Sequence, residues 1–203
     1  MPHRWLLRHS ASDGKVAPER LALRRLDPGH SLYRCHPLEY GAIHFGRTAR
    51  NRFDDPQGGF GVCYFSLSPV GAFAETLIRR PTGQVLQKSD LLRWGLTTVQ
   101  TRRGLSLLHC HGAGLKRNGL DSRISSTVDR RVPQSLARVF HEHPDGPDGL
   151  LYRARHDDDQ LSVALFERAS DKLAAPGPSI SWMQAGPLLG LVLDRYGIAL
   201  IDA

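Results

Sequence analysis

NRFDDPQGGFGVCYFSLSPVGAFAETLIR, residues 51–79, is the stretch that decides the fold of this chain and suggests its chemistry. Arg52 lies in a polar turn, and a Gly-rich bend leads from it into the apolar run Val62–Phe65, which predicts a buried strand. A serine and a proline then begin a helical pattern that carries one carboxylate, Glu75. A cation, the phenol of Tyr64 and a carboxylate therefore follow one another on three consecutive elements. These groups could hold an anion, stack on a ring and stabilise a developing cation.

Hydrophobic periodicity predicts further strands and helices on both sides of this stretch. Strands are predicted at 31–35, 62–66, 90–100, 104–110, 150–156, 161–166 and 197–201. Helices are predicted at 18–25, 69–79, 133–143 and 188–196, with Pro81–Gly83 ending the second of them. A strand and loop are expected over 38–50, and loops over 111–119 and 121–127. The acidic run Asp157–Asp159 lacks the spaced ligands of a calcium loop, so it predicts a solvated turn between two strands.

Two side chains in these elements have alternative interpretations. Arg34, in the strand predicted at 31–35, faces either a cleft or, if that strand is at the edge of a sheet, the solvent. Glu75 is either a solvated helix residue or is drawn inward by the apolar neighbours on its helix.

The composition is that of a single-domain globular protein. The chain has 203 residues, of which 40% are hydrophobic and 23% are charged. The net charge is +7, and arginine supplies nearly all of the cations. Arginine suits bidentate binding of phosphate or carboxylate. Because the arginines are spread along the chain, a nucleotide-type anion or an acidic protein is favoured as a partner over nucleic acid.

Several functional classes are not supported by the sequence. Cys35, Cys63 and Cys110 are an odd number without CxxC spacing, which argues against a disulfide framework and a four-cysteine zinc site. The histidines form no HExxH motif, and no metal is predicted. No apolar run has the length of a membrane span, and the first ten residues do not read as a signal peptide, so a cytoplasmic protein is expected.

The order of several short segments resembles the RES domain family, which is named for an Arg, a Glu and a Ser. The segments are YR at 33–34, RFDDP at 52–56, VCYF at 62–65, AFAETL at 72–77, DGLLYRARH at 148–156 and VALFER at 163–168. Together they extend over roughly residues 30–200. The resemblance implies one RES-like domain over residues 1–203, with an N-terminal extension at 1–30 and a core at 31–203.

The resemblance also implies a fold and an activity. The fold is α+β, similar to ADP-ribosyltransferases, with a split, mainly antiparallel sheet flanked by helices around an NAD cleft. The family includes toxins that cleave the nicotinamide–ribose bond of NAD+, with phosphate or water as acceptor, and that an Xre-type antitoxin neutralises. By position, Arg52 and Glu75 correspond to catalytic residues, and Arg34, Arg52 and Tyr64 to residues that bind NAD+. NAD+ is then the substrate, inorganic phosphate a possible second substrate, and no metal is required.

One position departs from the family pattern. The family serine is expected where this chain has Ala154, which has no hydroxyl to orient NAD+ or phosphate. The chain could be an inactivated toxin, a variant that positions NAD+ by other groups, or a pseudoenzyme that binds NAD+ or an antitoxin. Transfer of ADP-ribose to a protein is a further enzyme hypothesis, and a basic nucleic-acid-binding module is a further non-enzyme one. The oligomeric state is not predicted.

Overall fold

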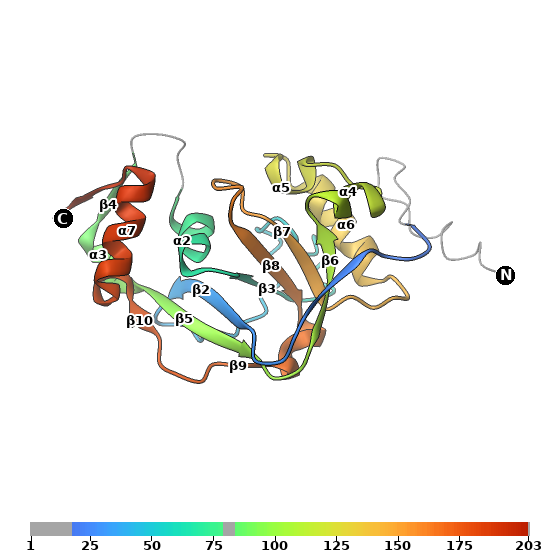
Figure 1. The fold of residues 1–203 in the computed structure, drawn as a ribbon, viewed down its shortest axis with the longest axis horizontal. Coiled ribbons are helices and arrows are strands. Elements are labelled where there is room, and N and C mark those ends of the chain that lie inside the picture. The colour runs from blue at the N-terminus through green and yellow to red at the C-terminus, as the bar shows by residue number, and fades with distance from the viewer. Residues whose placement is uncertain (1–17, 79–83, 203) are drawn as a thin grey trace.

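A nine-stranded, mainly antiparallel sheet is the centre of the computed structural model, which describes residues 18–78 and 84–202 (Figure 1). The strand order is β1-β6-β7-β8-β3-β2-β5-β10, and β9 pairs with β5. These strands are β1 (Leu23–Leu26), β2 (Ser31–Pro37), β3 (Val62–Ser66), β5 (Trp94–Thr101), β6 (Leu105–Cys110), β7 (Gly149–Arg153), β8 (Leu161–Phe166), β9 (Leu173–Ala174) and β10 (Ile180–Ser181). Neighbouring strands are antiparallel except β6 and β7, which run parallel.

Helices flank this sheet, so the predicted α+β class is confirmed (Figure 1). They are α2 (Pro69–Leu77), α3 (Lys88–Arg93), α4 (Ala113–Arg117), α5 (Arg123–Ser126), α6 (Arg131–His141) and α7 (Pro187–Tyr196), with 3-10 helices η1 (Glu167–Lys172) and η2 (Trp182–Ala185). A small parallel sheet pairs β4 (Val85–Gln87) with β11 (Ala199–Ile201). In Figure 1, α4, α5 and α6 gather at one end of the molecule and α3 and α7 at the other, with α2 between them.

The large sheet is split between β2 and β3. These two strands share a single register pair, Tyr33 with Ser66. On their other sides, β2 pairs with β5 from Ser31 to Pro37, and β3 pairs with β8 from Val62 to Ser66. The two halves of the sheet therefore diverge beyond one point of contact, which leaves space between the strands that carry Arg34 and Tyr64.

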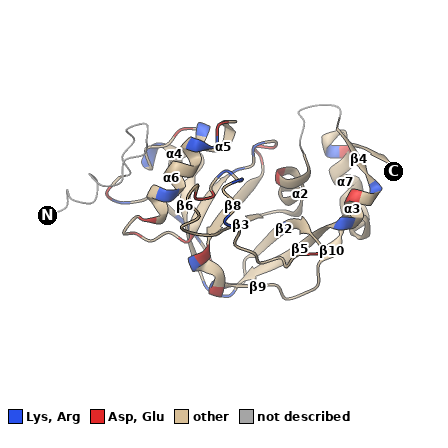
Figure 2. Ribbon diagram, turned by 180° about the vertical axis from the view of Figure 1, so that it is seen from behind, with Lys and Arg blue, Asp and Glu red and all other residues tan. Residues whose placement is uncertain are grey.

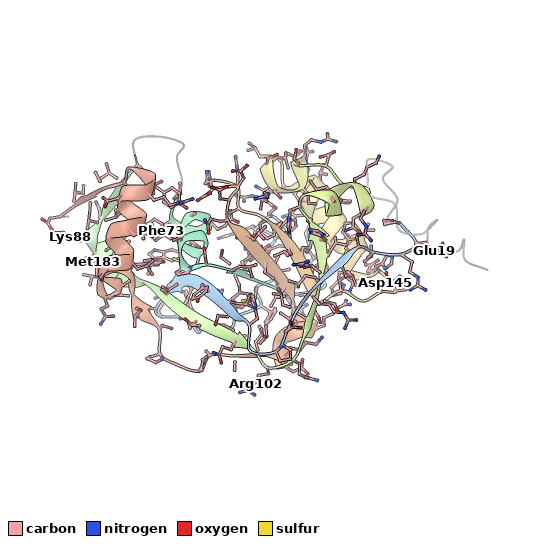
Figure 3. The ribbon with its side chains drawn as sticks, in the orientation of Figure 1. Glu19, Phe73, Lys88, Arg102, Asp145 and Met183 are labelled. Carbon is pink, nitrogen blue, oxygen red and sulfur yellow. The ribbon has the colours of Figure 1, made fainter. Side chains whose placement is uncertain are left out.

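Helix α2 begins where its local sequence predicts. The Ser68 hydroxyl accepts a hydrogen bond from Gly71 N at 2.9 Å, which satisfies one of the free backbone donors of the first turn. Pro69 occupies the first turn, where its missing N–H costs nothing. Phe73 packs edge-on against Trp182 with ring centroids 4.9 Å apart, and Figure 3 shows it on the side of α2 that faces α7. This packing turns the opposite side of the helix, with Glu75, toward the split.

Three clusters of buried side chains form the core. One lies between α6 and strands β3, β6, β7 and β8, and includes Phe53, Phe140 and Phe166. A second joins α2, α3, α7 and η2 to β2 and β5. The third fills the other face of the sheet with mainly aliphatic residues from both halves, among them Leu32 and Val163. Alternate residues of β3 enter different clusters, because successive side chains of a strand point to opposite faces.

Several sequence predictions are wrong in local detail. Residues 23–26 form β1, paired with β6, where a helix was predicted over 18–25. Residues 88–93 form α3, so the strand predicted at 90–100 begins only at Trp94. The predicted loops at 111–119 and 121–127 contain the short helices α4 and α5. In each case pairing or packing with distant residues outweighs a weak local preference.

The remaining strand and helix predictions are confirmed within a few residues at their ends. The strand expected within 38–50 is reduced to an isolated bridge between Gly46 and Val62. The predicted helix end at Arg79 and the stop at Pro81–Gly83 lie outside the described residues.

Charged residues are distributed over both ends of the molecule. In Figure 2 basic and acidic positions are interspersed, with basic segments on α6 at one end and on α7 at the other. Among residues 18–78 and 84–202, no helix has the length and apolar character needed to cross a membrane.

Candidate functional site

A cavity of about 490 Å³ opens where β2 and β3 diverge. Its walls come from β2, β3, α2, β7 and the loop that carries Arg52, so segments distant in sequence meet there. Among the described residues, its charged lining consists of Arg34, Arg52, Arg130, Arg155 and one carboxylate, Glu75. This excess of cations favours an anionic ligand.

Glu75 is the acidic centre of this cavity. It lies on α2 and is half-buried, in agreement with the interpretation that its neighbours draw it inward. Its Oε1 accepts a hydrogen bond from the backbone N–H of Arg155 at 2.7 Å, and its Oε2 accepts one from the Tyr152 hydroxyl at 3.1 Å. Two donors on separate atoms hold the plane of the carboxylate, so its position is defined before any ligand binds.

Tyr152 is a site residue that sequence reasoning missed. It lies on β7 and is 2% exposed, with its hydroxyl aimed at Glu75. Burial and the neighbouring carboxylate raise the pKa of Tyr152 well above its ordinary value. The phenol therefore keeps its proton at neutral pH and donates a hydrogen bond to Glu75. A tyrosine two residues before Ala154 was visible in the sequence, but a strand position alone does not reveal a partner on a distant helix.

Arg52 is held beside Glu75 and Tyr152 by the loop that precedes β3. Its Nη1 donates to the carbonyl of Thr127 at 2.8 Å. Burial lowers the pKa of Arg52, while the nearby Tyr152 and Glu75 act in the opposite direction. A guanidinium remains charged under these conditions, so Arg52 presents a fixed, partly desolvated cation to the cavity.

The loop around Arg52 is attached to α6. Gln134, which is 7% exposed, donates from Nε2 to the carbonyls of Ala49 and Asn51, both at 2.9 Å. Ala49 has a positive φ of 57°, a conformation that costs an alanine free energy and persists only where its surroundings hold it. The Gln134 amide thus stabilises the backbone that places Arg52.

Asp54 does not line the cavity but supports the turn that carries Arg52, and it was not singled out in the sequence. It is 1% exposed, and its Oδ1 accepts a hydrogen bond from the Tyr64 hydroxyl at 2.8 Å. Its Oδ2 accepts from Asn51 N and Nδ2, both at 3.1 Å, and from Thr48 Oγ1 at 3.2 Å. A buried carboxylate with four donors fixes the turn that Arg52 belongs to.

The Tyr64 hydroxyl is fully engaged in this turn. Besides donating to Asp54, it accepts a hydrogen bond from Phe53 N at 2.9 Å. Burial and the neighbouring Asp54 raise the pKa of Tyr64 well above its ordinary value, so the phenol stays neutral. Tyr64 also lines the cavity, where its ring is the part available for the predicted stacking. Its hydroxyl instead connects β3 to the Arg52 turn.

Arg34 faces the cavity. Its strand, β2, lies between β3 and β5, so the edge-strand alternative is wrong. The guanidinium donates to the carbonyl of Ala42 and lies over the Phe65 ring, 5.9 Å from its centroid. Arg34 and Arg52 therefore enter the same cavity from different strands and loops.

Ala154 does not line the cavity as Glu75 and the arginines do. It is 2% exposed, directly follows β7, and donates its N–H to the carbonyl of Gln160 at 2.9 Å. A hydroxyl is nevertheless buried close by in the sheet: Ser162 of β8 pairs in register with Tyr152. The Ser162 hydroxyl is buried and faces the Tyr152 hydroxyl. Burial raises the pKa of Tyr152, and the contact with Ser162 acts to lower that pKa against this larger effect.

Among the described cysteines and histidines, neither the thiols of Cys63 and Cys110 nor the imidazoles of His109 and His111 support a second catalytic centre by their burial and contacts. Cys63 and Cys110 are buried free thiols whose pKa values burial raises, which disfavours the thiolate that a nucleophile needs. His109 and His111 stack edge-on, with ring centroids 4.3 Å apart. Within residues 18–78 and 84–202, no group of three His, Cys, Asp or Glu residues could hold a metal ion.

Comparison with known proteins supports the resemblance seen in the sequence. The fold is similar to that of a chain in the crystal structure of the M. tuberculosis MbcT–MbcA toxin–antitoxin complex, with a TM-score of 0.59. The two chains are 14% identical, and the match covers 82% of this chain and 92% of that one. A search of curated proteins gives no match. The family model described as "RES domain" matches residues 25–185, and the chain therefore belongs to the RES domain family.

Proposed function

We propose that this chain is an NAD+-consuming toxin that cleaves the nicotinamide–ribose bond and is neutralised by an Xre-type antitoxin. Membership of the RES domain family supports the substrate class. The fold shared with a chain of a toxin–antitoxin complex supports the biological setting. The substrate is NAD+, and phosphate or water accepts the ADP-ribosyl group.

The observation that carries this proposal is the Glu75 carboxylate, held by two hydrogen bonds at a cavity whose other charged lining residues, among those described, are arginines. A dinucleotide has an anionic pyrophosphate and, during cleavage, a ribose that becomes positively charged. A site for this reaction must therefore bind an anion and also stabilise a cation, and the arginines and Glu75 of the cavity can do both. Cations at a short distance bind the pyrophosphate, and a fixed carboxylate stabilises the developing charge.

The reaction requires little acid–base chemistry. The bond between the ribose anomeric carbon and the nicotinamide nitrogen breaks, and its electron pair leaves with nicotinamide, which becomes neutral. The resulting oxocarbenium-like ribose is stabilised by Glu75, most strongly in a site with few waters. A phosphate oxygen or a water oxygen then forms the new bond to the anomeric carbon, and water loses its proton to solvent.

The remaining site residues bind and orient the substrate. Arg52 and Arg34 bind the pyrophosphate or an incoming phosphate, and orientation by such fixed groups lowers the entropic cost of the reaction. The ring of Tyr64 stacks on nicotinamide. The Tyr152 hydroxyl and the Arg155 amide donate hydrogen bonds to Glu75 and fix the orientation of its carboxylate.

A pseudoenzyme is the second candidate, and Ala154 is the observation that favours it. In the resemblance a serine hydroxyl at this position orients NAD+ or phosphate, and alanine cannot do so. The chain would then bind NAD+ or an antitoxin without cleaving the glycosidic bond.

Incubation of the purified protein with NAD+, with and without inorganic phosphate, tests both candidates. The wild-type chain, Ala154→Ser and Glu75→Gln are compared, with Glu142→Gln as the control because Glu142 is an exposed carboxylate at the C-cap of α6. We expect the wild type to release nicotinamide and Ala154→Ser to release it faster. The rate of release by Glu75→Gln should fall at least about 100-fold, because the group that stabilises the charge of the transition state is removed.

The products separate the reaction types. Phosphorylated ADP-ribose formed only with phosphate indicates phosphorolysis, free ADP-ribose indicates hydrolysis, and label retained on protein indicates ADP-ribosyl transfer. If neither wild type nor Ala154→Ser consumes NAD+, the enzyme proposal fails. If the wild type binds NAD+ without cleaving it, and Ala154→Ser restores cleavage, the result supports the pseudoenzyme.

The toxin proposal has its own test. Expression of the chain in bacteria should arrest growth and deplete cellular NAD+. Co-expression of the small helix-turn-helix protein expected beside its gene should restore growth. Growth arrest that persists in Glu75→Gln would mean that toxicity does not depend on this site.

A further inference from the structure

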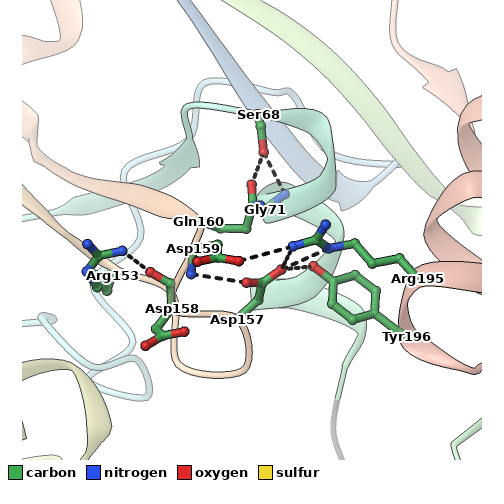
Figure 4. A network of polar contacts seen from close by, with 9 residues as sticks. All are labelled: Ser68, Gly71, Arg153, Asp157, Asp158, Asp159, Gln160, Arg195 and Tyr196. Atoms are coloured by element: carbon green, nitrogen blue, oxygen red, sulfur yellow. Dashed lines mark hydrogen bonds and ion pairs between the residues drawn. The ribbon is translucent and has the colours of Figure 1, made fainter.

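The turn between β7 and β8 is tied to α7 through one buried carboxylate. Asp157 Oδ2 accepts hydrogen bonds from the Tyr196 hydroxyl at 2.6 Å and from Arg195 Nε and Nη2 at 3.1 and 3.0 Å (Figure 4). The Asp157 side chain is 8% exposed, whereas that of Asp159 in the same turn is 81% exposed. The predicted solvated turn is therefore correct for Asp159 but not for Asp157, which is a docking group.

The same turn is also tied to the start of α2. Within the turn, Gln160 N donates to the carbonyl of Asp157 at 3.0 Å, and Ala154 N donates to that of Gln160 at 2.9 Å. The Gln160 side chain accepts from the Ser68 hydroxyl at 2.5 Å, and that hydroxyl also caps α2 (Figure 4). The turn is thus closed on itself and attached on two sides, to α2 and to α7.

Arg155 lies inside this closed turn, between Ala154 and Asp157. Its backbone N–H is the 2.7 Å donor to Glu75 Oε1. The place of this donor depends on the path of the turn backbone, because the Arg155 side chain is exposed and takes no part in the bond. The carboxylate of α2 is therefore oriented by a backbone group whose own position is set from α7.

We propose that Asp157, held by Tyr196 and Arg195, is a positioning residue that keeps the Arg155 amide on Glu75. Its catalytic consequence rests on the function proposed above. Helix α7 begins at Pro187, so Arg195 and Tyr196 lie outside residues 25–185 that match the family model.

The charges around the turn agree with this role. Burial acts to raise the pKa of Asp157, but hydrogen bonds from Tyr196 and Arg195 outweigh it and lower that pKa. Asp157 is therefore ionised at neutral pH and accepts all three hydrogen bonds. Three successive aspartates repel one another, and Arg195, which also lies 3.7 Å from Asp159, offsets this repulsion.

Amide hydrogen exchange tests the positioning role without reference to activity. Asp157→Ala and Tyr196→Phe are compared with wild type and with Asp159→Asn, whose carboxylate is exposed. We expect exchange of the Arg155 amide to rise about tenfold or more in Asp157→Ala and less in Tyr196→Phe, because Arg195 still holds the turn there. Asp159→Asn should match wild type, and amides in the centres of β7 and β8 should stay protected in all variants.

An unchanged Arg155 amide in Asp157→Ala overturns the proposal. An equal rise in the exchange rates of all amides of β7 and β8 also overturns it, because that would mean general destabilisation. With NAD+ as substrate, kcat of Asp157→Ala should fall about tenfold while KM stays within about twofold, since the arginines still bind the substrate. If the wild type consumes no NAD+, the proposed function fails, while the exchange result still decides the positioning role.

Discussion

Truncation of Asp54 tests how the Arg52 turn is held. Asp54→Ala removes a buried carboxylate that accepts hydrogen bonds from Tyr64, Asn51 and Thr48. A hydrogen bond to a charged group contributes about 1.5–3 kcal/mol, and a buried donor left without an acceptor costs about 1–3 kcal/mol. Asn51 and Thr48 are exposed and can bond to water instead, so the Tyr64 hydroxyl bears most of the cost. We expect the free energy of unfolding to fall by about 2–4 kcal/mol.

Chemical denaturation followed by circular dichroism measures this change. Thermal unfolding should show a drop in Tm of about 10 °C, given ~2–4 °C per kcal/mol for a chain of this size. The control is Asp129→Ala, which removes an exposed carboxylate that pairs with Arg131 and accepts a hydrogen bond from its backbone N–H, and which should lower the free energy of unfolding much less than Asp54→Ala does. Asp54→Asn keeps the shape and one acceptor, and should lie between the wild type and Asp54→Ala.

A double-mutant cycle identifies the responsible bond. Tyr64→Phe alone should destabilise the protein, but should cost much less in the Asp54→Ala background, with a coupling of about 1–2 kcal/mol. If the losses of the two single variants add fully, or if Asp54→Ala unfolds like Asp129→Ala, the buried carboxylate does not hold the turn as inferred.

Three further predictions concern Tyr152, His141 and Gly149. Tyr152→Phe removes one donor to Glu75, and NAD+ consumption should show kcat reduced about tenfold with folding retained; an unchanged kcat would contradict the orienting role. Burial, with a smaller effect of a nearby arginine, lowers the pKa of His141 from 6.5 to about 4. The unfolded chain then takes up a proton first as pH falls, so stability is full above pH 6.5 and decreases toward pH 4. Because the ring is half exposed, the loss is about 1–2 kcal/mol, and His141→Phe, which keeps the ring stack, should flatten the denaturation profile in this window. A Cβ on Gly149 would lie 2.1 Å from a backbone oxygen of β8, so Gly149→Ala should cost more than about 3 kcal/mol. Its control, Gly190→Ala on α7, meets nothing within 4 Å and should stabilise slightly; equal effects of the two would refute this packing argument.

The local elements of the opening stretch could be predicted because short-range physics specifies them. Strand β3 follows from its β-branched and aromatic residues, and α2 follows from a capping serine and a proline in its first turn. The relation of Arg52, Tyr64 and Glu75 could also be predicted in outline, because consecutive elements are usually neighbours in space.

Where local preference was weak, the predictions failed. The short segment Leu23–Leu26 is a strand because it pairs with β6, far along the chain, and residues 88–93 are helical although their apolar run reads as a strand. A four-residue segment gains too little from its own conformation to resist such pairing. Only the tertiary contact decides its state.

The sequence by itself determined the cation, the phenol and the carboxylate of the candidate site, their order along the chain, and the presence of an alanine at position 154. Only the tertiary structure decided how Glu75 is held. Its two donors come from positions 77 and 80 residues away, Tyr152 and Arg155, and one of them is a backbone N–H. Residue types can be read from a sequence, but a hydrogen bond between distant backbone and side-chain atoms exists only once the sheet has brought both segments together.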